Sequence, residues 1–306
     1  MSAPGRDAAR SPQRDSAGNQ LRAIFEDAGA RGWFHAMSLD RPDEAISLDA
    51  DHVVPMASVY KLPLTIAFAE LVDRGALNAQ EPITLQPSDR TPGPTGLSIF
   101  SDPVTLSLRD LAASTMALSD NAAADALLEV VGLDRVADLL QRAGLTSTRV
   151  RRGTADNLRE LVRRTRATDA DAALAVLADN DTTDPSGVYE AANASATTAR
   201  DMTTLLSALW SGELLSAPQT AFVRRLMAQQ VFTQRIASAF PHDAVRVYGK
   251  TGTFGALRHE VGIVELPGGP TVAVAALTRA ARADKRLPRV DAAIGQATRY
   301  AVDRLR

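Results

Sequence analysis

The sequence predicts a mixed α+β protein in which an antiparallel sheet carries a separate helical lobe. Segments with the alternating apolar pattern of strands lie near both ends of the chain, whereas the middle shows almost only the apolar spacing of helices. The strands at the two ends can join one sheet only if the middle packs beside it. We therefore expect two lobes, with a cleft between them as the natural ligand site.

The predicted sheet has one helix before it and one after it. Residues 19–32 have helical apolar spacing and end in glycine, and residues 291–305 repeat that spacing at the end of the chain. Five strands are predicted, over residues 33–40, 44–52, 244–253, 258–267 and 271–279. These segments belong to the expected α/β lobe, about residues 19–57 and 216–306.

Residues 58–215 form the expected helical lobe. Helices are predicted over residues 58–77, 105–132 with a short break, 133–145 and 196–215, with a further one over 218–230. Residues 149–184 hold a run of arginines and then a run of aspartates. Because the acidic half neutralises the basic half, we interpret them as solvated helix faces rather than as a nucleic-acid patch. Residues 1–18 are polar and predict a disordered leader, which leaves residues 19–306 as one domain.

The composition excludes several classes of function. The chain has 306 residues, 45% hydrophobic and 23% charged, with a net charge of −2 and a pI of about 6.1, so neither nucleic acid nor a membrane surface would attract it. No cysteine and four dispersed histidines predict no disulfide and no metal site. There is no apolar stretch of about 18 residues, so we predict no transmembrane helix, and the polar N-terminus does not resemble a signal peptide. We expect a monomer that is cytoplasmic as encoded, or secreted or periplasmic if a leader is missing.

The stretch "MASVYKLPLT", residues 56–65, places a serine three positions before a lysine. The chain retains only three lysines, Lys61, Lys250 and Lys285, against a background of arginine. Arginine stays protonated in proteins, whereas a lysine can give up its proton and act as a base. On a helix, Ser58 and Lys61 share one face, so the amine can reach the hydroxyl. The pattern indicates a nucleophilic serine with a lysine beside it.

Two further motifs follow this one. "SDN", at Ser119–Asn121, lies in the break between two predicted helices, and "KTGT", at Lys250–Thr253, ends a predicted strand. The three motifs in this order resemble those of the serine β-lactamases and penicillin-binding proteins, and in detail the class A β-lactamases, over roughly residues 20–305. The resemblance implies a three-layer α/β/α sandwich with an inserted all-helical lobe, and a serine hydrolase that uses no metal or organic cofactor.

The resemblance also gives a role to each motif residue. Ser58 would be acylated, Lys61 would accept its proton, and Ser119 would pass a proton to the leaving nitrogen. The residues that would bind the substrate, a small β-lactam or a peptide-like amide or ester, are Asn121, Lys250, Thr251, Gly252 and Thr253.

Four supporting roles follow from the same resemblance. Asp120 would hold the local backbone, and the backbone N–H groups of Ser58 and Thr253 would form the oxyanion hole. Gly252 would let the substrate approach the strand edge. Arg258 is a candidate for binding the substrate carboxylate, with a surface role as the alternative.

One part of the class A pattern is missing from this sequence. Class A enzymes hydrolyse the acyl-enzyme with a glutamate from an E-x-x-x-N stretch, which this sequence lacks. Counting back from "TTARDM" places the corresponding loop near residues 180–195, where Glu190 or Asp184 could activate the water. We expect β-lactam ring hydrolysis. The alternatives are a D-Ala-D-Ala peptidase, esterase or acyl-transfer enzyme on the same scaffold, or a β-lactam-binding protein without turnover.

Overall fold

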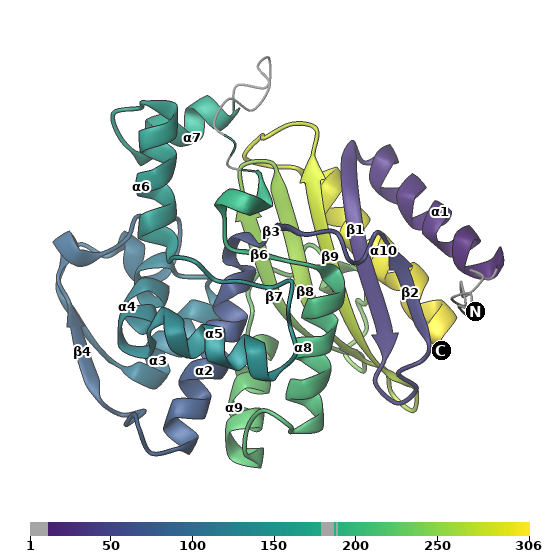
Figure 1. The fold of residues 1–306 in the computed structure, drawn as a ribbon, viewed down its shortest axis with the longest axis horizontal. Helices are drawn as coiled ribbons and strands as arrows, with labels where there is room; N and C mark the ends of the chain where they lie inside the picture. Colours follow the sequence, from purple (N-terminus) through teal and green to yellow (C-terminus); the bar gives the residue numbers. More distant parts are fainter. Residues whose placement is uncertain (1–11, 179–186, 188) are drawn as a thin grey trace, which may run out of the picture.

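The computed structural model describes residues 12–178, 187 and 189–306. Its central sheet has five antiparallel strands in the order β2-β1-β9-β8-β7, which confirms that the two ends of the chain share one sheet (Figure 1). The strands are β1 (Ala30–Ser38), β2 (Ala45–Leu48), β7 (Arg246–Phe254), β8 (Leu257–Glu265) and β9 (Thr271–Ala280). In the register, Gly252 of β7 lies opposite His259 of β8, and His259 lies opposite Leu277 of β9.

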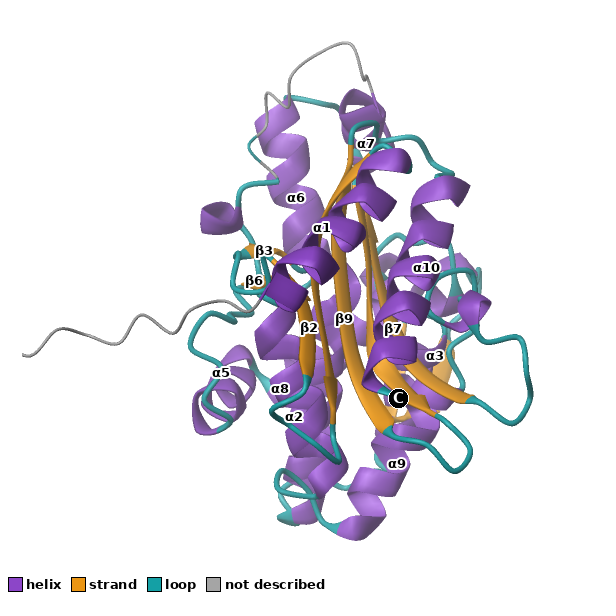
Figure 2. Cartoon of the chain, turned by 90° about the vertical axis from the view of Figure 1, so that its right-hand side faces the viewer, coloured by secondary structure: helices purple, strands orange, loops and turns teal. Residues whose placement is uncertain are grey.

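Helices α1 (Pro12–Asp27) and α10 (Pro288–Leu305) cover one face of the sheet (Figure 2). Phe25 of α1, Phe34 of β1 and Ile294 of α10 are fully buried or nearly so in the core on this face. The prediction of a disordered leader is wrong for residues 12–18, because α1 begins at Pro12. The small residues Ala17 and Gly18 explain the difference: Ala17 is buried, and a Cβ on Gly18 would lie 3.4 Å from the Ser47 carbonyl of β2.

The helical lobe packs against the opposite face of the sheet. Its helices are α2 (Lys61–Asp73), α3 (Leu108–Ala117), α4 (Asn121–Val131), α5 (Leu133–Arg142), α8 (Ala199–Ser211) and α9 (Ala217–Ala228). One apolar cluster contains Phe68 of α2, Met116 of α3 and Leu205 of α8 together with Ile263 and Leu277 of the sheet. The core of the helical lobe is therefore continuous with that of the sheet, and the two lobes are firmly joined.

Short strands and 3₁₀ turns connect the lobes, and two helices begin later in the chain than predicted. β3 (Val54–Pro55) pairs with β6 (Ala196–Thr197), and β4 (Pro82–Leu85) pairs with β5 (Val104–Ser107). The helix expected from residue 105 begins at Leu108, and the one expected from residue 196 begins at Ala199. Ser107 and Thr198 cap these helices, since each hydroxyl accepts a hydrogen bond from a backbone N–H of the first turn. The 3₁₀ turns are η1 (Ala57–Tyr60), η2 (Pro87–Asp89), η3 (Gly96–Ile99), η4 (Ala191–Asn193) and η5 (Ala237–Ala239).

The segment rich in arginine and aspartate folds as the hairpin of α6 (Thr154–Thr165) and α7 (Ala170–Ala178). On α6, Glu160 forms ion pairs with Arg163 and Arg164, so the acidic partners of these two arginines lie on the same helix. The interpretation of the whole segment as solvated helix faces stays a prediction. Leu161, Ala173 and Leu177 form a small core between the two helices, and Phe254 packs against it. The hairpin therefore lies beside the end of β7, directly after the KTGT motif.

No described helix is both long and apolar enough to cross a membrane. At 18 residues, α10 is the longest of them. It carries five charged side chains, Arg289, Asp291, Arg299, Asp303 and Arg304.

We expect Leu161→Ala to open the α6–α7 hairpin locally. Leu→Ala in a core costs about 2–5 kcal/mol, and this small core has few other contacts to compensate. Trypsin should then cleave after Arg163 and Arg164 faster than in the wild type, while the midpoint of global thermal unfolding changes little. Leu174→Ala on the exposed side of α7 is the matched control. A global destabilisation without faster cleavage would contradict this local role.

Candidate active site

Ser58 lies in η1, a tight turn that leads directly into α2. The residue before it, Ala57, has φ +45°, a left-handed conformation that residues with a Cβ seldom adopt. Met56 N donates to Ser195 O (3.0 Å) on one side of the turn, and Val59 N donates to Met56 O (3.0 Å) within it. Strained backbone of this kind persists only where its surroundings hold it, and it is common at active sites.

Lys61 is completely buried at the start of α2. Its Nζ donates to Ser119 O (2.6 Å) and Asn121 Oδ1 (2.9 Å), and lies 3.5 Å from Ser119 Oγ. Burial lowers the pKa of Lys61 to about 7, although the carboxylates of Asp125 and Asp120 favour the charged form. A large fraction of this amine is therefore neutral at neutral pH and able to accept a proton.

Ser58 Oγ makes no hydrogen bond with any described residue. Ser58 lies near Lys61 because the two residues are one turn apart, where η1 continues into α2. Ser58 is half-buried, so part of it is accessible from outside.

Lys250 approaches Ser119 from the sheet. Its Nζ donates to Ser119 Oγ (2.9 Å) and to Thr251 O (2.8 Å). Burial lowers the pKa of Lys250 well below its ordinary value, and the positive charges of Lys61 and Arg235 lower it further. The hydroxyl of Ser119 thus lies between two buried amines, one from each lobe. All three motifs meet at this point, as their order in the sequence suggested.

Asp120 holds the loop that carries Ser119. Its carboxylate caps α4 through Ala122 N (3.0 Å) and Ala123 N (3.3 Å). It also accepts hydrogen bonds from three groups outside that helix, Leu97 N (2.7 Å), Ser114 Oγ (2.7 Å) and Ser98 Oγ (3.2 Å). This arrangement agrees with the supporting role expected for Asp120.

Asn121 has both ends of its amide engaged. Oδ1 accepts from Lys61, and Nδ2 donates to Pro92 O (2.9 Å). Nδ2 carries a second N–H, which bonds with no described residue. Substrate binding by Asn121 stays a prediction.

The outer edge of β7 faces the site. Thr251 N donates to the Gln230 side chain (2.6 Å) and therefore points away from β8. Because alternate residues of a strand direct their N–H groups to the same edge, Thr253 N points to this edge too. That direction suits the oxyanion donor expected of Thr253.

Gly252 has a packing role that the sequence did not indicate. A Cβ at this position would lie 3.0 Å from Met56 O and 3.0 Å from Val59 Cγ2. The missing side chain therefore lets the turn that carries Ser58 pack onto β7. The close approach of a substrate to this strand edge stays a prediction.

Arg235, which no sequence motif marks, is the arginine that contacts Thr253. It donates to Thr253 Oγ1 (2.7 Å), Gly252 O (3.1 Å) and His259 O (2.6 Å), and pairs with Asp291 (2.7 Å). The sequence could not indicate these contacts, because they form only when the loop after α9, which carries Arg235, packs against β7.

Arg258, the arginine proposed from the sequence, does not fill the role of a carboxylate ligand. It is 3% exposed. Its NH1 and NH2 donate to backbone carbonyls, including Gly255 O (2.6 Å) and Asp284 O (2.8 Å). Its charged end stabilises the turn after β7 and has no free face toward an incoming carboxylate.

Glu190 is exposed, and its carboxylate accepts a hydrogen bond from Asn193 Nδ2 (3.3 Å). It contacts none of Ser58, Lys61 and Ser119. Asp184, the alternative base, lies outside the described residues. The predicted role of Glu190 in activating a water stays a prediction.

The start of α6 packs beside the nucleophile's turn. Thr154 Oγ1 bonds with the hydroxyl of the buried Tyr60 (2.9 Å), and Asp125 accepts from Thr154 N and Ala155 N (2.7 Å each). Residues near 154 therefore contact the turn that carries Ser58.

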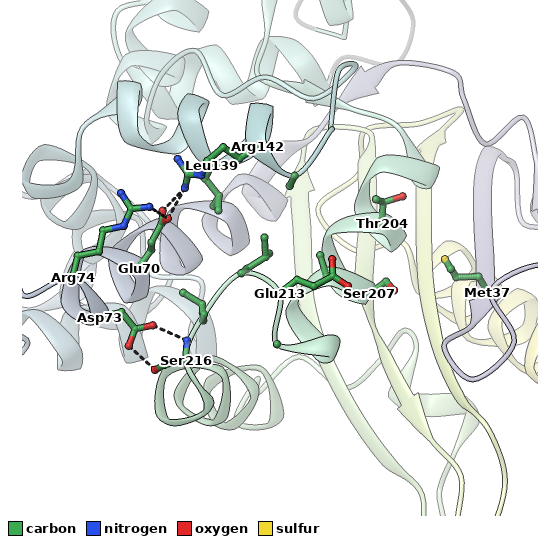
Figure 3. Close-up of a pocket in the computed structure, with 15 residues that line it drawn as sticks. Met37, Glu70, Asp73, Arg74, Leu139, Arg142, Thr204, Ser207, Glu213 and Ser216 are labelled. Carbon is green, nitrogen blue, oxygen red and sulfur yellow. Dashed lines mark hydrogen bonds and ion pairs between the residues drawn. The ribbon is translucent and has the colours of Figure 1, made fainter.

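The large pocket of Figure 3 is a separate feature. It has a volume of about 740 Å³ and lies at the far end of α2, where Arg74 and Arg142 both pair with Glu70. No motif residue lines it. Among the described residues there is also no cluster of three or more acidic or histidine side chains that could hold a metal ion.

Comparison with known proteins agrees with the motifs. The family model described as "Beta-lactamase enzyme family" matches residues 16–305. The β-lactamase regulatory protein BlaB of Streptomyces cacaoi is 32% identical over 303 residues, which cover 94% of this chain and 96% of that protein.

Solved structures confirm the fold. An ancestral class A β-lactamase (GNCA) superposes with a TM-score of 0.75 at 22% identity, covering 94% of this chain and 99% of that one. The structure of PBP-A gives a TM-score of 0.73 at 20% identity, covering 93% and 94%. Through its match over nearly the whole length, this chain belongs to the β-lactamase enzyme family.

Proposed function

We propose that this protein opens β-lactam rings by forming an acyl-enzyme on Ser58. The observation that carries the proposal is the meeting of two buried lysines at Ser119, with the pKa of Lys61 lowered to about 7. A buried amine that is partly neutral near pH 7 has no evident structural value, since an apolar side chain would pack there without the cost of desolvation. It has the properties of a base beside a nucleophile.

The proposed reaction includes three proton transfers. Ser58 Oγ bonds to the ring carbonyl carbon as its proton passes to Lys61, and the oxygen charge that develops is bound by the N–H groups of Ser58 and Thr253. The ring C–N bond then breaks. The nitrogen takes the proton of Ser119, and Ser119 recovers one from Lys61. Lys250, Thr251 and Thr253 attract the substrate carboxylate, helped by the positive charge of Arg235 behind them.

A second proposal concerns the release of the acyl group. Among the described residues, no carboxylate contacts Ser58 or Lys61. The two that affect the charge of Lys61, Asp125 and Asp120, have their oxygens engaged by backbone N–H groups. We therefore propose that hydrolysis is slow and that the acylated form persists. A persistent acylated state would suit a β-lactam-sensing role, and BlaB, a relative of this chain, is named a regulatory protein.

Peptidase, esterase and acyl-transfer activities use the same nucleophile and remain alternatives for the substrate. Turnover of a chromogenic cephalosporin against that of a p-nitrophenyl ester distinguishes them from β-lactam hydrolysis. Faster turnover of the ester would favour these alternatives.

Intact-mass spectrometry with benzylpenicillin tests both proposals. The protein should gain the whole mass of the antibiotic, because ring opening expels no atom, and Ser58→Ala should gain none. After the free antibiotic is removed, the adduct should persist in the wild type and equally in Glu190→Gln. No adduct on the wild type would contradict acylation. An adduct that disappears within minutes in the wild type and persists in Glu190→Gln would contradict slow release and identify Glu190 as the base.

The rate of acylation should rise with pH through about 7, the pKa of Lys61. The protonated amine cannot accept the proton of Ser58, so the rate is low below this pH, and between pH 6 and pH 8 we expect an increase of about tenfold. The measurement is the labelling rate with a saturating fluorescent penicillin. Lys61→Arg should abolish labelling at every pH, because arginine stays protonated. Lys285→Arg is the matched control, and an unchanged rate from pH 6 to pH 8 in the wild type would contradict the role of Lys61.

A further inference from the structure

His259 is a completely buried histidine in the middle of the sheet. Residues paired across two strands point to the same face of a sheet, so His259 of β8 and Gly252 of β7 both face the helical lobe. The turn η1 packs on this pair, since Met56 O and Val59 lie directly over the missing Cβ of Gly252. The imidazole thus lies under the segment that leads to Ser58.

The hydrogen bonds of the imidazole define its tautomer. Nδ1 accepts a hydrogen bond from Thr278 N (3.0 Å), so this nitrogen carries no proton. The proton is on Nε2, which lies 2.9 Å from Pro55 O and donates to it. Burial lowers the pKa of His259 to about 4, so the ring stays neutral over the pH range in which Lys61 titrates. Both ring nitrogens are therefore satisfied in a single orientation.

Pro55 immediately precedes Met56 and the strained turn. Beyond it, Ala57 has φ +45°, and Ser58 follows. Met56 N is held by Ser195 O from the side of β6, while His259 holds the Pro55 carbonyl from the sheet. The two bonds fix consecutive residues from opposite directions, which is what a strained conformation needs in order to persist.

An apolar residue would suit the position better if packing were its only purpose. The neighbours of His259 on the same face of β8 and β9, Val261, Ile263 and Leu277, belong to the apolar core. Burying an imidazole among them costs free energy unless its nitrogens are bonded. Compared with an apolar side chain, the histidine adds a hydrogen bond from Nε2–H to Pro55 O.

We propose that His259 is a positioning residue for the nucleophile: its bond to Pro55 O holds the turn at Ala57 and so directs Ser58 Oγ toward Lys61 and the substrate carbonyl. The inference rests on the proposed function, in which Ser58 is acylated. Misplacing a reacting group by about 1 Å can cost a factor of about 10² in rate. Loss of the bond should therefore slow acylation without weakening the initial binding of the antibiotic.

Two substitutions of His259 separate positioning from folding. The side-chain amide of Gln reaches about as far as Nε2 and can donate to Pro55 O, whereas that of Asn reaches only as far as Nδ1 and keeps the bond with Thr278 N. We expect both variants to be destabilised to a similar extent in thermal unfolding. His259→Gln should acylate within about threefold of the wild-type rate, and His259→Asn about 10- to 100-fold more slowly.

The readout is the fluorescent-penicillin labelling rate as a function of antibiotic concentration. It yields the limiting acylation rate and the dissociation constant of the complex before acylation. We expect His259→Asn to lower the first and leave the second unchanged, with the midpoint of the pH profile still near that of the wild type. Equal limiting rates in the two variants, whether fast or slow, would overturn the proposal.

The wild type keeps this test separate from that of the proposed function. A wild type that is not labelled would refute acylation itself, whereas a labelled wild type with equal rates in the two variants would refute only the role of His259. If His259→Asn is too unstable to purify, His259→Ala is compared with and without added imidazole. Labelling that imidazole accelerates supports the proposal, and labelling that it does not accelerate counts against it.

Discussion

The site depends on the burial of two lysines on either side of one hydroxyl. Lys61 comes from the helical lobe and Lys250 from the sheet, and both contact Ser119. Burial and mutual repulsion lower the pKa of Lys250, and burial lowers that of Lys61 to about 7. Because these pKa values lie below those of an unfolded chain, the two lysines destabilise the fold at neutral pH, and this cost falls as the pH rises toward the ordinary pKa of lysine.

The surrounding structure holds this unfavourable arrangement in place. Asp120 fixes the Ser119 loop by binding five donors. Behind β7, the buried carboxylate of Glu260 accepts from Gln230 Nε2 and Ile236 N (2.7 Å each), and Gln230 in turn binds Thr251 N. The negative charge of Glu260 favours the protonated form of Lys250. These polar contacts stabilise Glu260 and Lys250, whose charges would otherwise be unfavourable in the apolar core beside the sheet.

Much of the fold and the centre of the site could be predicted from the sequence. Alternating apolar residues identified the five strands, and the rarity of lysine pointed to Lys61 and Lys250 before any fold was known. Arg235 and His259 could not be recognised, because their contacts join segments far apart in the chain and follow no spacing rule. The packing role of Gly252 could not be recognised for the same reason: what lies over it is the turn of Ser58, almost two hundred residues earlier. The helical start of α1 was missed because its small polar residues look unstructured until β2 lies beside them.

The two steps of the proposed reaction differ in how far the described residues supply them. The groups proposed for acylation, around Ser58 and Ser119, lie together, whereas no carboxylate among the described residues contacts Ser58 or Lys61.

The central claim is that Lys61 is neutral enough at neutral pH to act as a base. The chain has only three lysines, so NMR of protein labelled with ¹⁵N and ¹³C at lysine gives three side-chain signals, which Lys61→Arg and Lys285→Arg assign. Our account predicts that the Lys61 signal titrates near pH 7, well below the ordinary pKa of lysine. A Lys61 signal that keeps its proton up to that ordinary value would contradict the account.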